Sequence, residues 1–308
     1  MAGTGKAHMR QEGDKVLEVN DLVMNYKAGR KTVVSAVAGV SFDVLRGETL
    51  AIVGESGCGK STLGKAILQL PRPTSGSVKL GGDELTSFDD SALRAVRPCM
   101  QMIFQDPISS LDPRLQVKNI VDEPLKVWGR GDDAEREKKV NELLTAVGLD
   151  PAVVRDRRPW EFSGGQCQRI SVSIQAQILN LLQDMKDRFG LTMIFISHDL
   201  SVVKQVSTRV LVMYLGKVCE VAPPDALYAN PAHHYAKALI GSVPVPDPRR
   251  GRAKATIEGE PPSPMNPPSG CRFRTRCPAA TDLCAQQEPE LREIASGHFV
   301  ACHHPNPR

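Results

Sequence analysis

The stretch TLAIVGESGCGKSTLGKAI, Thr49 to Ile67, combines the patterns of a strand, a glycine-rich loop and a helix. The run TLAIV is short and fully apolar, which is typical of a buried parallel strand. The loop that follows, Gly54 to Thr62, matches the pattern G-x-x-x-x-G-K-[ST] and leads into a predicted helix. Because loop N–H groups can surround an anion at a helix N-terminus, this order of elements predicts a phosphate site. Motif and context together argue against a glycine-rich turn without a ligand.

The polar groups of this loop have distinct expected roles. Lys60 is expected to reach the β- and γ-phosphates of a bound nucleotide, and Ser61 to ligate Mg²⁺. Cys58 is expected to be a spacer and not a nucleophile. The predicted nucleotide-contacting residues of the loop are Gly54, Glu55, Ser56, Gly57, Cys58, Gly59, Lys60, Ser61 and Thr62.

Length and composition limit the class of protein. The chain has 308 residues, 41% of them apolar, and a formal net charge of +4. Such a chain can bury a core, and its charge gives little reason to expect nucleic acid as a partner. No apolar run approaches the roughly 20 residues of a membrane helix. The polar start MAGTGKAHMRQEGDK lacks the apolar stretch of a signal peptide. We therefore expect a cytoplasmic chain whose membrane role is peripheral.

Strand and helix patterns alternate along the chain, which favours an α/β fold with helices around a parallel sheet. Helices are expected over 114–128, 133–147 and 174–190. Further strands are expected in VLEVNDLVMNY (16–26), MQMIF (100–104), LTMIFIS (191–197) and RVLVMYLGKVCEV (209–221).

A second glycine motif, FSGGQCQR at 162–169, offers a hydroxyl and backbone N–H groups where a helix is expected to begin. With MIFQDPISSLDPR (102–114) and FISHDLSVV (195–203), it makes the chain resemble the ATP-binding cassette of ABC transporters. The resemblance covers residues 16–304. It implies a phosphate-loop NTPase fold with a mixed sheet, a helical subdomain and a Cys-containing C-terminal extension. It also implies that two cassettes pair head to tail, each signature closing over the ATP of the other.

The resemblance assigns roles to further residues. Tyr26 stands where the family places an aromatic side chain that stacks on adenine, with an ordinary core tyrosine as the alternative. Gln105 would contact Mg²⁺ and the attacking water, and His198 the γ-phosphate, so these two are the expected catalytic residues. Asp199 is expected to cap a helix. The signature residues expected to contact nucleotide are Ser163, Gly164, Gly165 and Gln166.

Two stretches make the resemblance narrower. FQDPISSLDPR (104–114) and GCRFRTRCPAATDLC (270–284) resemble the oligopeptide and dipeptide importer subfamily. That implies an ATP-binding subunit on the cytoplasmic face of the membrane. Its partners would be two transmembrane permease subunits, a second cassette and, indirectly, an extracytoplasmic peptide-binding protein. Nickel or another small solute is an alternative cargo. A DNA-repair cassette would carry long heptad arms between the phosphate loop and the signature, and the sequence has none.

The cassette pattern is incomplete after the signature. The family places there a buried strand ending in Asp, which holds the Mg²⁺ shell, and then a Glu that polarises the attacking water. Here only residues 170–172 separate Arg169 from the next predicted helix, and Ser163 lies 35 positions before His198. The missing elements need about 20 further residues by ordinary element lengths.

We interpret the junction near 170–173 as an internal deletion. The expected chain contacts ATP but hydrolyses it poorly, because it lacks both carboxylates. A cassette without turnover, serving as the structural or regulatory half of a heterodimer, is the alternative function.

Composition divides the chain into a nucleotide-binding domain at 16–243, a Pro/Gly-rich linker at 244–269 and a Cys-rich extension at 270–308. The polar extension is expected to lack a core of its own and to need a staple. Between its cysteines, Arg272, Arg274 and Arg276 are expected to form a solvated basic rim.

Four cysteines of the extension have the spacing C-x5-C-x6-C-x17-C. Zinc sites more often contain closer pairs, and four thiolates also suit a [4Fe–4S] cluster. The similar tail of the importer subfamily is associated with such clusters, so iron–sulfur is the first choice, zinc the second, and free thiols the remaining alternative. The expected ligands are Cys271, Cys277, Cys284 and Cys302.

Overall fold

The computed structural model describes residues 6–28, 32–102, 112–129, 131–146, 149–158, 161, 186, 190–197, 199–242 and 259–307. The chain forms two compact units, one combining residues 1–96 with 186–308 and the other spanning 97–185. The domain boundaries after 243 and 269, which rest on composition, fall within the first unit and stay predictions.

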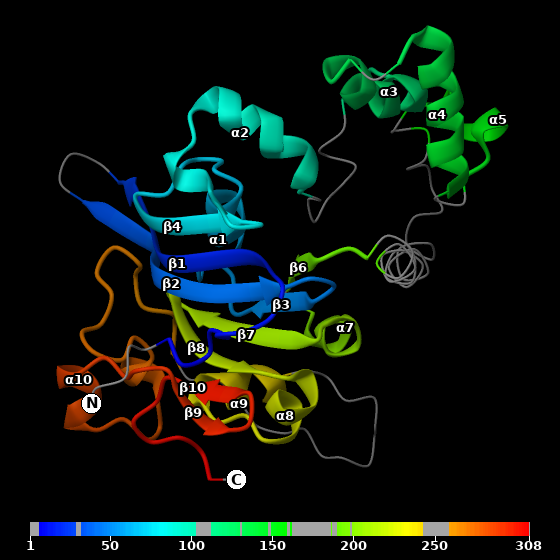
Figure 1. Cartoon of the computed structure of the whole chain (residues 1–308). Helices are drawn as coiled ribbons and strands as arrows, with labels where there is room; N and C mark the ends of the chain where they lie inside the picture. Colours follow the sequence, from blue (N-terminus) through cyan, green and yellow to red (C-terminus); the bar gives the residue numbers. More distant parts are fainter. Residues whose placement is uncertain are drawn as a thin grey trace, which may run out of the picture. The chain divides into compact units, whose positions relative to one another are not determined.

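The first unit begins with an antiparallel sheet (Figure 1). Its strands run in the order β2-β1-β4-β5, and β1 covers the predicted strand at 16–26. Apolar side chains of β1 alternate between the core and the partly exposed face, which is the pattern of a half-buried strand. The strands are β1 (Lys15–Lys27), β2 (Val33–Leu45), β4 (Ser75–Leu80) and β5 (Asp83–Glu84).

The second sheet of this unit carries the phosphate loop. β3 is buried along its whole length and pairs in parallel with β6 and β7, while the remaining pairs are antiparallel. The expected α/β fold with a mixed sheet is therefore confirmed. In the order β6-β3-β7-β8-β10-β9, the strands are β3 (Thr49–Val53), β6 (Met193–Ile196), β7 (Arg209–Tyr214), β8 (Lys217–Ala222), β9 (Arg292–Ala295) and β10 (His298–Val300).

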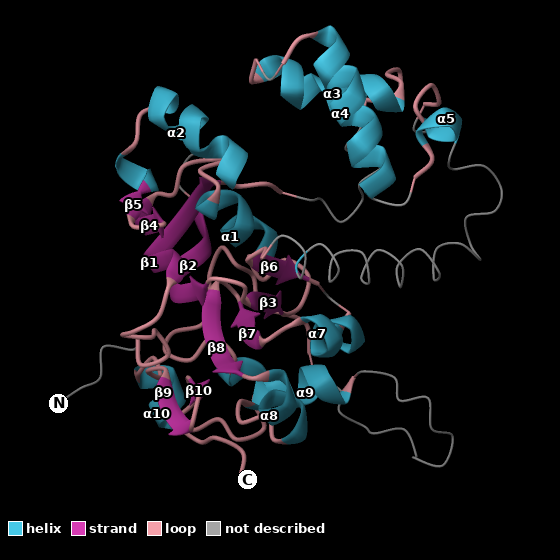
Figure 2. Cartoon of the chain, turned by 45° about the vertical axis from the view of Figure 1, so that its right-hand side comes forward, coloured by secondary structure: helices cyan, strands magenta, loops and turns pink. Residues whose placement is uncertain are grey.

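Helices pack on both sheets (Figure 2). α1 (Lys60–Ile67) contacts β1 and β2 of the first sheet and β6 of the second. α7 (Leu200–Val206) contacts β3, and α8 (Pro224–Ala229) and α9 (His234–Gly241) contact β8. Shorter elements of the unit are α2 (Asp90–Val96), α10 (Asp282–Gln286) and 3-10 helices at Leu85–Ser87 and Arg274–Arg276.

The second unit is helical in its described part. A small core of Val140, Leu144 and Val154 joins its helices. The helices expected at 114–128 and 133–147 are confirmed with shorter bounds. The elements are a 3-10 helix at Arg97–Cys99, α3 (Val117–Val127), α4 (Asp133–Ala146) and α5 (Pro151–Val154).

One predicted strand is wrong where it can be checked. Residues 100–102 of MQMIF form no strand, and 103 and 104 lie outside the described residues. A second strand, β6, is hydrogen-bonded only to β3 among the described strands. All its residues, MIFI, are only partly buried. A parallel strand of this composition is normally buried between two neighbours, so β6 departs from that pattern in the part of the chain that the structure describes.

The C-terminal extension is part of the first unit's core, which corrects the expectation that it lacks one. Phe273 is 2% exposed and belongs to the same hydrophobic cluster as Tyr214 and Tyr235. β10 pairs with β8, and β9 continues the sheet beyond it. The apolar side chains of the extension are therefore covered by β7, β8 and α9, and no separate core is needed.

Glu220 fastens the extension to the sheet. Its carboxylate is fully buried and accepts hydrogen bonds from Ala232 N at 2.8 Å, His233 N at 2.7 Å and His298 Nε2 at 2.6 Å. The single side chain thus joins β8, the start of α9 and β10. A buried carboxylate is stable only with such a full set of donors.

Replacing Glu220 with Gln is expected to lower the free energy of unfolding by about 2–3 kcal/mol, because the new NH₂ group faces donors and leaves one unsatisfied. Urea unfolding, monitored by circular dichroism, measures the loss of unfolding free energy. Glu288→Gln is the matched control: Glu288 pairs with Lys217 but is 57% exposed, so its loss should stay within about 1 kcal/mol. Equal losses for the two variants would contradict the fastening role of Glu220.

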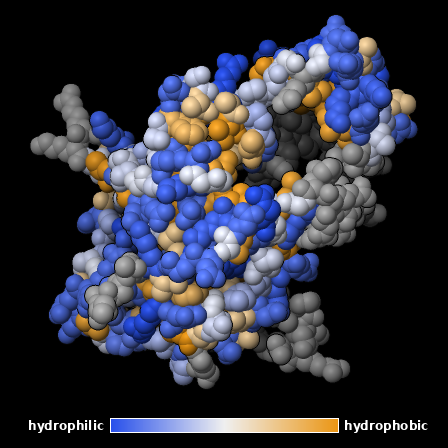
Figure 3. Space-filling view, in the orientation of Figure 1, coloured by the Kyte–Doolittle hydropathy of each residue, from blue (hydrophilic) through white to orange (hydrophobic). Residues whose placement is uncertain are grey.

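None of the described helices is both long enough and apolar enough to cross a bilayer. The visible face is mostly hydrophilic, with apolar residues in small groups (Figure 3). Exposed apolar side chains of the second unit include Val127, Leu143 and Val153.

Candidate functional site

The phosphate loop lies at the carboxyl end of β3 and runs into the first turn of α1. Gly54, Gly57 and Gly59 have φ angles of 150°, 78° and 106°, which non-glycine residues rarely adopt. A Cβ on Gly54 would lie 2.2 Å from Met213 O, and one on Gly59 would lie 2.1 Å from Ala36 O. Glycine at these two positions therefore lets the loop pass close to neighbouring backbone.

Lys60 lies at the centre of the loop. Its side chain is buried, and Nζ donates to Gly54 O and Glu55 O, both at 2.8 Å, with Cys58 Sγ at 3.6 Å. The ammonium group is thus surrounded by the backbone that the sequence predicts to hold phosphates. Ser61 follows at the first turn of α1 with an exposed side chain, where its hydroxyl can reach a ligand.

Cys58 is 3% exposed, and burial raises the pKa of its thiol. A neutral, buried thiol is a poor nucleophile. These properties agree with its expected role as a spacer. Ser56 and Gly57 are exposed at the outer turn of the loop.

Glu55 is held from the C-terminal half of the chain. Arg276 Nη1 and Nη2 lie 2.8 Å and 3.2 Å from the two carboxylate oxygens of Glu55, and Nη1 also lies 3.3 Å from Tyr214 Oη. The backbone N–H of Glu55 donates to Tyr235 Oη at 2.6 Å. Sequence analysis missed Arg276, Tyr214 and Tyr235, and no local pattern indicates contacts across 221 positions.

The expected basic rim is therefore wrong for two of its three arginines. The Arg276 side chain is 5% exposed. Although burial disfavours its charge, hydrogen bonds to Glu55 and Tyr214 keep its pKa above the ordinary value. Arg272 donates to Leu215 O and is partly buried. Arg274 bonds to Ser269 O at 3.0 Å near the surface.

Of the other predicted site residues, the structure describes Tyr26 and Asp199. Tyr26 is 40% exposed near the end of β1, so it is not the core tyrosine that was the alternative. Asp199 accepts from Ser201 N and Val202 N at the start of α7, which confirms the helix cap. The remaining predicted residues, Gln105, Ser163, Gly164, Gly165, Gln166 and His198, and the junction at 170–173, lie outside the described residues.

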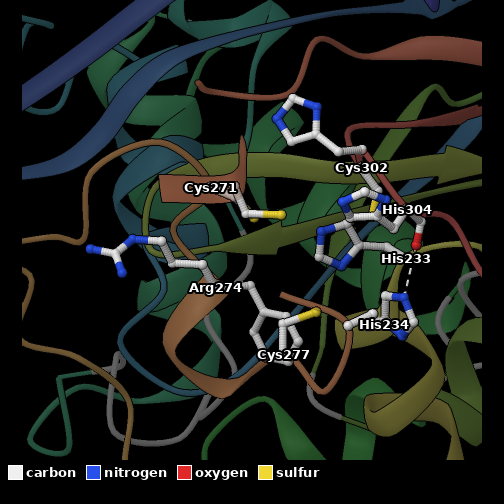
Figure 4. Close-up of a pocket in the computed structure, with 11 residues that line it drawn as sticks. His233, His234, Cys271, Arg274, Cys277, Cys302 and His304 are labelled. Atoms are coloured by element: carbon white, nitrogen blue, oxygen red, sulfur yellow. Dashed lines mark hydrogen bonds between the residues drawn. The ribbon is translucent and has the colours of Figure 1, made fainter. Parts of the chain in front are cut away.

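The four cysteines of the extension line one cavity (Figure 4). The sulfur atoms of Cys271, Cys277 and Cys302 point toward it, and Cys284 completes the set. Cys271 N donates to Cys284 O at 2.8 Å, which closes the loop that carries three of them. Histidines from α9 and its N-cap and from the chain's end share the lining: His233, His234, His303 and His304.

The electrostatics of this cavity favour neutral thiols. Burial raises the pKa of Cys271 and Cys277, and that of Cys302 to about 11. Four thiols around one cavity match the donor set of an iron–sulfur cluster. Among the described residues, however, no three Cys, His, Asp or Glu side chains are placed so that they could hold a metal ion. The donors fit by chemistry and by their shared cavity, but not by spacing around a single ion.

Comparison with known proteins finds two family matches along the chain. Residues 37–179 match the family described as ABC transporter, and residues 219–284 match the family described as oligopeptide/dipeptide transporter, C-terminal region. The putative oligopeptide transport ATP-binding protein YkfD of Bacillus subtilis is 46% identical, with 94% of this chain and 95% of YkfD covered. The oligopeptide transport ATP-binding protein AppF of the same organism is 47% identical, with 88% and 89% covered.

A solved structure is also similar. The ATP-binding cassette MJ0796, in a dimeric post-hydrolysis state bound to ADP and Pi, has a TM-score of 0.58 and 25% identity. The match covers 68% of this chain and 98% of that chain.

The alignment with YkfD spans 313 positions, more than the 308 residues of this chain, although only 94% of the chain is aligned. Since 94% of 308 is about 290, about 23 aligned positions have no counterpart in this chain.

Proposed function

The chain belongs to the ABC transporter family, among the ATP-binding subunits of oligopeptide importers, and from that premise we propose how it works. It binds Mg²⁺-ATP at the loop between β3 and α1. The observation that carries this function is the position of Lys60, whose buried ammonium group lies within the glycine-rich turn. Lys60 would hold the β- and γ-phosphates, Ser61 the Mg²⁺, and Tyr26 the adenine.

The same proposal gives the subunit its partners. It lies on the cytoplasmic face of the membrane beneath two permease subunits, which receive peptides from an extracytoplasmic binding protein. A second cassette supplies the opposite half of each ATP site. In that dimer, Ser163, Gly164, Gly165 and Gln166 of this chain would close over the partner's nucleotide, and Gln105 and His198 would face the γ-phosphate.

Equilibrium binding of a fluorescent ATP analogue with Mg²⁺ tests the nucleotide site, and Lys60→Ala is the control that should lose it. Peptide uptake by the assembled transporter tests the cellular role. Failure of the unmodified chain to bind ATP, alone and beside a second cassette, would overturn the function.

We further propose that this chain does not hydrolyse ATP at a useful rate. The total length of the gaps in the alignment, about 23 positions, is about what a strand, its carboxylates and a turn require. β6, whose described neighbour is β3 alone, supports the same reading, because its apolar residues are only partly covered. These observations favour a second role, in which the chain is the silent half of a heterodimer whose partner hydrolyses ATP.

The cysteine cavity is proposed to hold a [4Fe–4S] cluster on Cys271, Cys277, Cys284 and Cys302. Its support is that all four thiols of the extension line one cavity. When bound, such a cluster would staple the extension and could exchange electrons.

Protein purified without oxygen is expected to be brown and to absorb in the blue region of the visible spectrum. Cys277→Ser should lose the colour and the iron, whereas Cys99→Ser should keep both, because Cys99 is exposed and belongs to the other unit. If the protein is colourless and contains zinc, the four cysteines bind zinc and not an iron–sulfur cluster. Colourless protein without metal would leave four free thiols.

A further inference from the structure

The extension reaches the phosphate loop through one ion pair. Arg276 approaches Glu55 with two nitrogens, at 2.8 Å and 3.2 Å, and the exposed fractions of the two side chains are 5% and 24%. Paired, two-pronged contacts of guanidinium and carboxylate are stronger than single ones and fix the mutual orientation. Since both side chains are mostly shielded from water, salt screens this pair less than a surface pair.

Glu55 is fixed at every polar group. Its carboxylate bonds to Arg276, its N–H donates to Tyr235 Oη, and its carbonyl accepts from Lys60 Nζ. The residue therefore joins the phosphate-binding lysine to α9 and to the extension. A shift of Arg276 would break its ion pair with the Glu55 carboxylate, and Glu55 would be held less firmly in the phosphate loop.

The path from this pair to the cysteine cavity is continuous. Tyr214 packs on Tyr235 at 4.7 Å and edge-on against Phe273 at 5.2 Å between ring centroids. Phe273 lines the cysteine cavity, and Arg276 directly precedes Cys277. The short segment from 271 to 277 thus carries two cavity cysteines, the aromatic contact and the arginine.

Charge explains what Arg276 does for the loop. Glu55 is the only acidic residue between Gly54 and Thr62, in a segment that must attract a polyanion. An uncompensated carboxylate there would repel the triphosphate. A guanidinium group paired with it removes this penalty and leaves the loop's N–H groups and Lys60 to set the potential.

We propose that Arg276 is a positioning residue of the nucleotide site, which neutralises Glu55 and makes the cysteine-bearing extension part of that site. The inference rests on the proposed function in one respect, namely that the loop binds ATP. It adds a residue outside the phosphate loop on which nucleotide affinity depends.

The test compares ATP affinity of the full-length chain with Mg²⁺, measured with a fluorescent analogue, among four variants. Arg276→Gln keeps a polar side chain but removes the charge and the two-pronged contact, so ATP affinity should fall about five- to tenfold. Arg276→Lys should recover most of the loss. The double variant Glu55→Gln with Arg276→Gln should bind ATP several-fold more tightly than Arg276→Gln alone, because no charge is left unpaired. Arg274→Gln is the matched control, since Figure 4 shows its guanidinium pointing away from the cysteines, and its affinity should not change.

Two further readouts separate this role from mere stabilisation. The loss for Arg276→Gln should be larger for ATP than for ADP, which carries less charge, and should shrink as salt is raised. Equal losses for both nucleotides, or a double variant as weak as Arg276→Gln, would overturn the proposal. So would unchanged affinity of Arg276→Gln when the unmodified chain binds ATP. Lack of binding by the unmodified chain would instead refute the proposed function itself.

Discussion

Phosphate release from ATP by this chain is expected to be about 10²–10⁴-fold slower than by the same chain with the missing segment restored, because positioned general bases contribute that much. On the proposal that a segment near 170–173 is deleted, the chain lacks both the Asp that holds the Mg²⁺ shell and the Glu that polarises water. The insert, taken from an aligned relative, would be placed near 170–173. A phosphate-release assay with Mg²⁺ measures both proteins.

Lys60→Ala in the restored chain sets the background of that assay, since it lacks the phosphate-binding ammonium group. Both chains should still bind ATP, so the difference lies in turnover and not in affinity. A natural chain that turns over as fast as its restored form would refute the defect. It would also require the carboxylate to come from elsewhere in the sequence.

Replacing Gly59 with Ala is expected to weaken ATP binding at least about a hundredfold. The new methyl group would lie 2.1 Å from Ala36 O at a φ of 106°, so the loop backbone has to move. Binding of a fluorescent ATP analogue measures the effect, and circular dichroism checks that the variant folds.

Gly57→Ala is the matched control in the same loop. Gly57 also has a left-handed φ, 78°, but a Cβ there would meet nothing within 4 Å. The loss of ATP-binding free energy for Gly57→Ala should be limited to the backbone preference for glycine at this φ, about 1–2 kcal/mol. If both substitutions weakened ATP binding equally, close approach to Ala36 would not be the reason for glycine at 59.

The sequence predicts those elements whose patterns are formed by residues adjacent in the chain. The strand TLAIV, the loop after it and α1 are adjacent in the chain, so their order alone predicts a phosphate site. The cap at Asp199 is equally local, because its carboxylate bonds to N–H groups two and three residues later.

Contacts between distant segments could not be predicted in this way. Arg276 and Glu55 are 221 positions apart, and an arginine between polar residues has the pattern of a surface side chain. The same reasoning misjudged the extension, whose core is supplied by β8 and α9 and not by its own residues. The strand expected at MQMIF is absent at 100–102, since apolar composition forms a strand only where a neighbour is available to pair.

β6 has a consequence for handling the protein. All four of its side chains, Met193 to Ile196, are apolar and only partly buried, so part of their apolar surface stays in contact with water. At high levels of expression, newly made copies would therefore associate through these side chains and collect in inclusion bodies. The restored chain, in which a further strand could cover them, would stay in the supernatant of the same lysate.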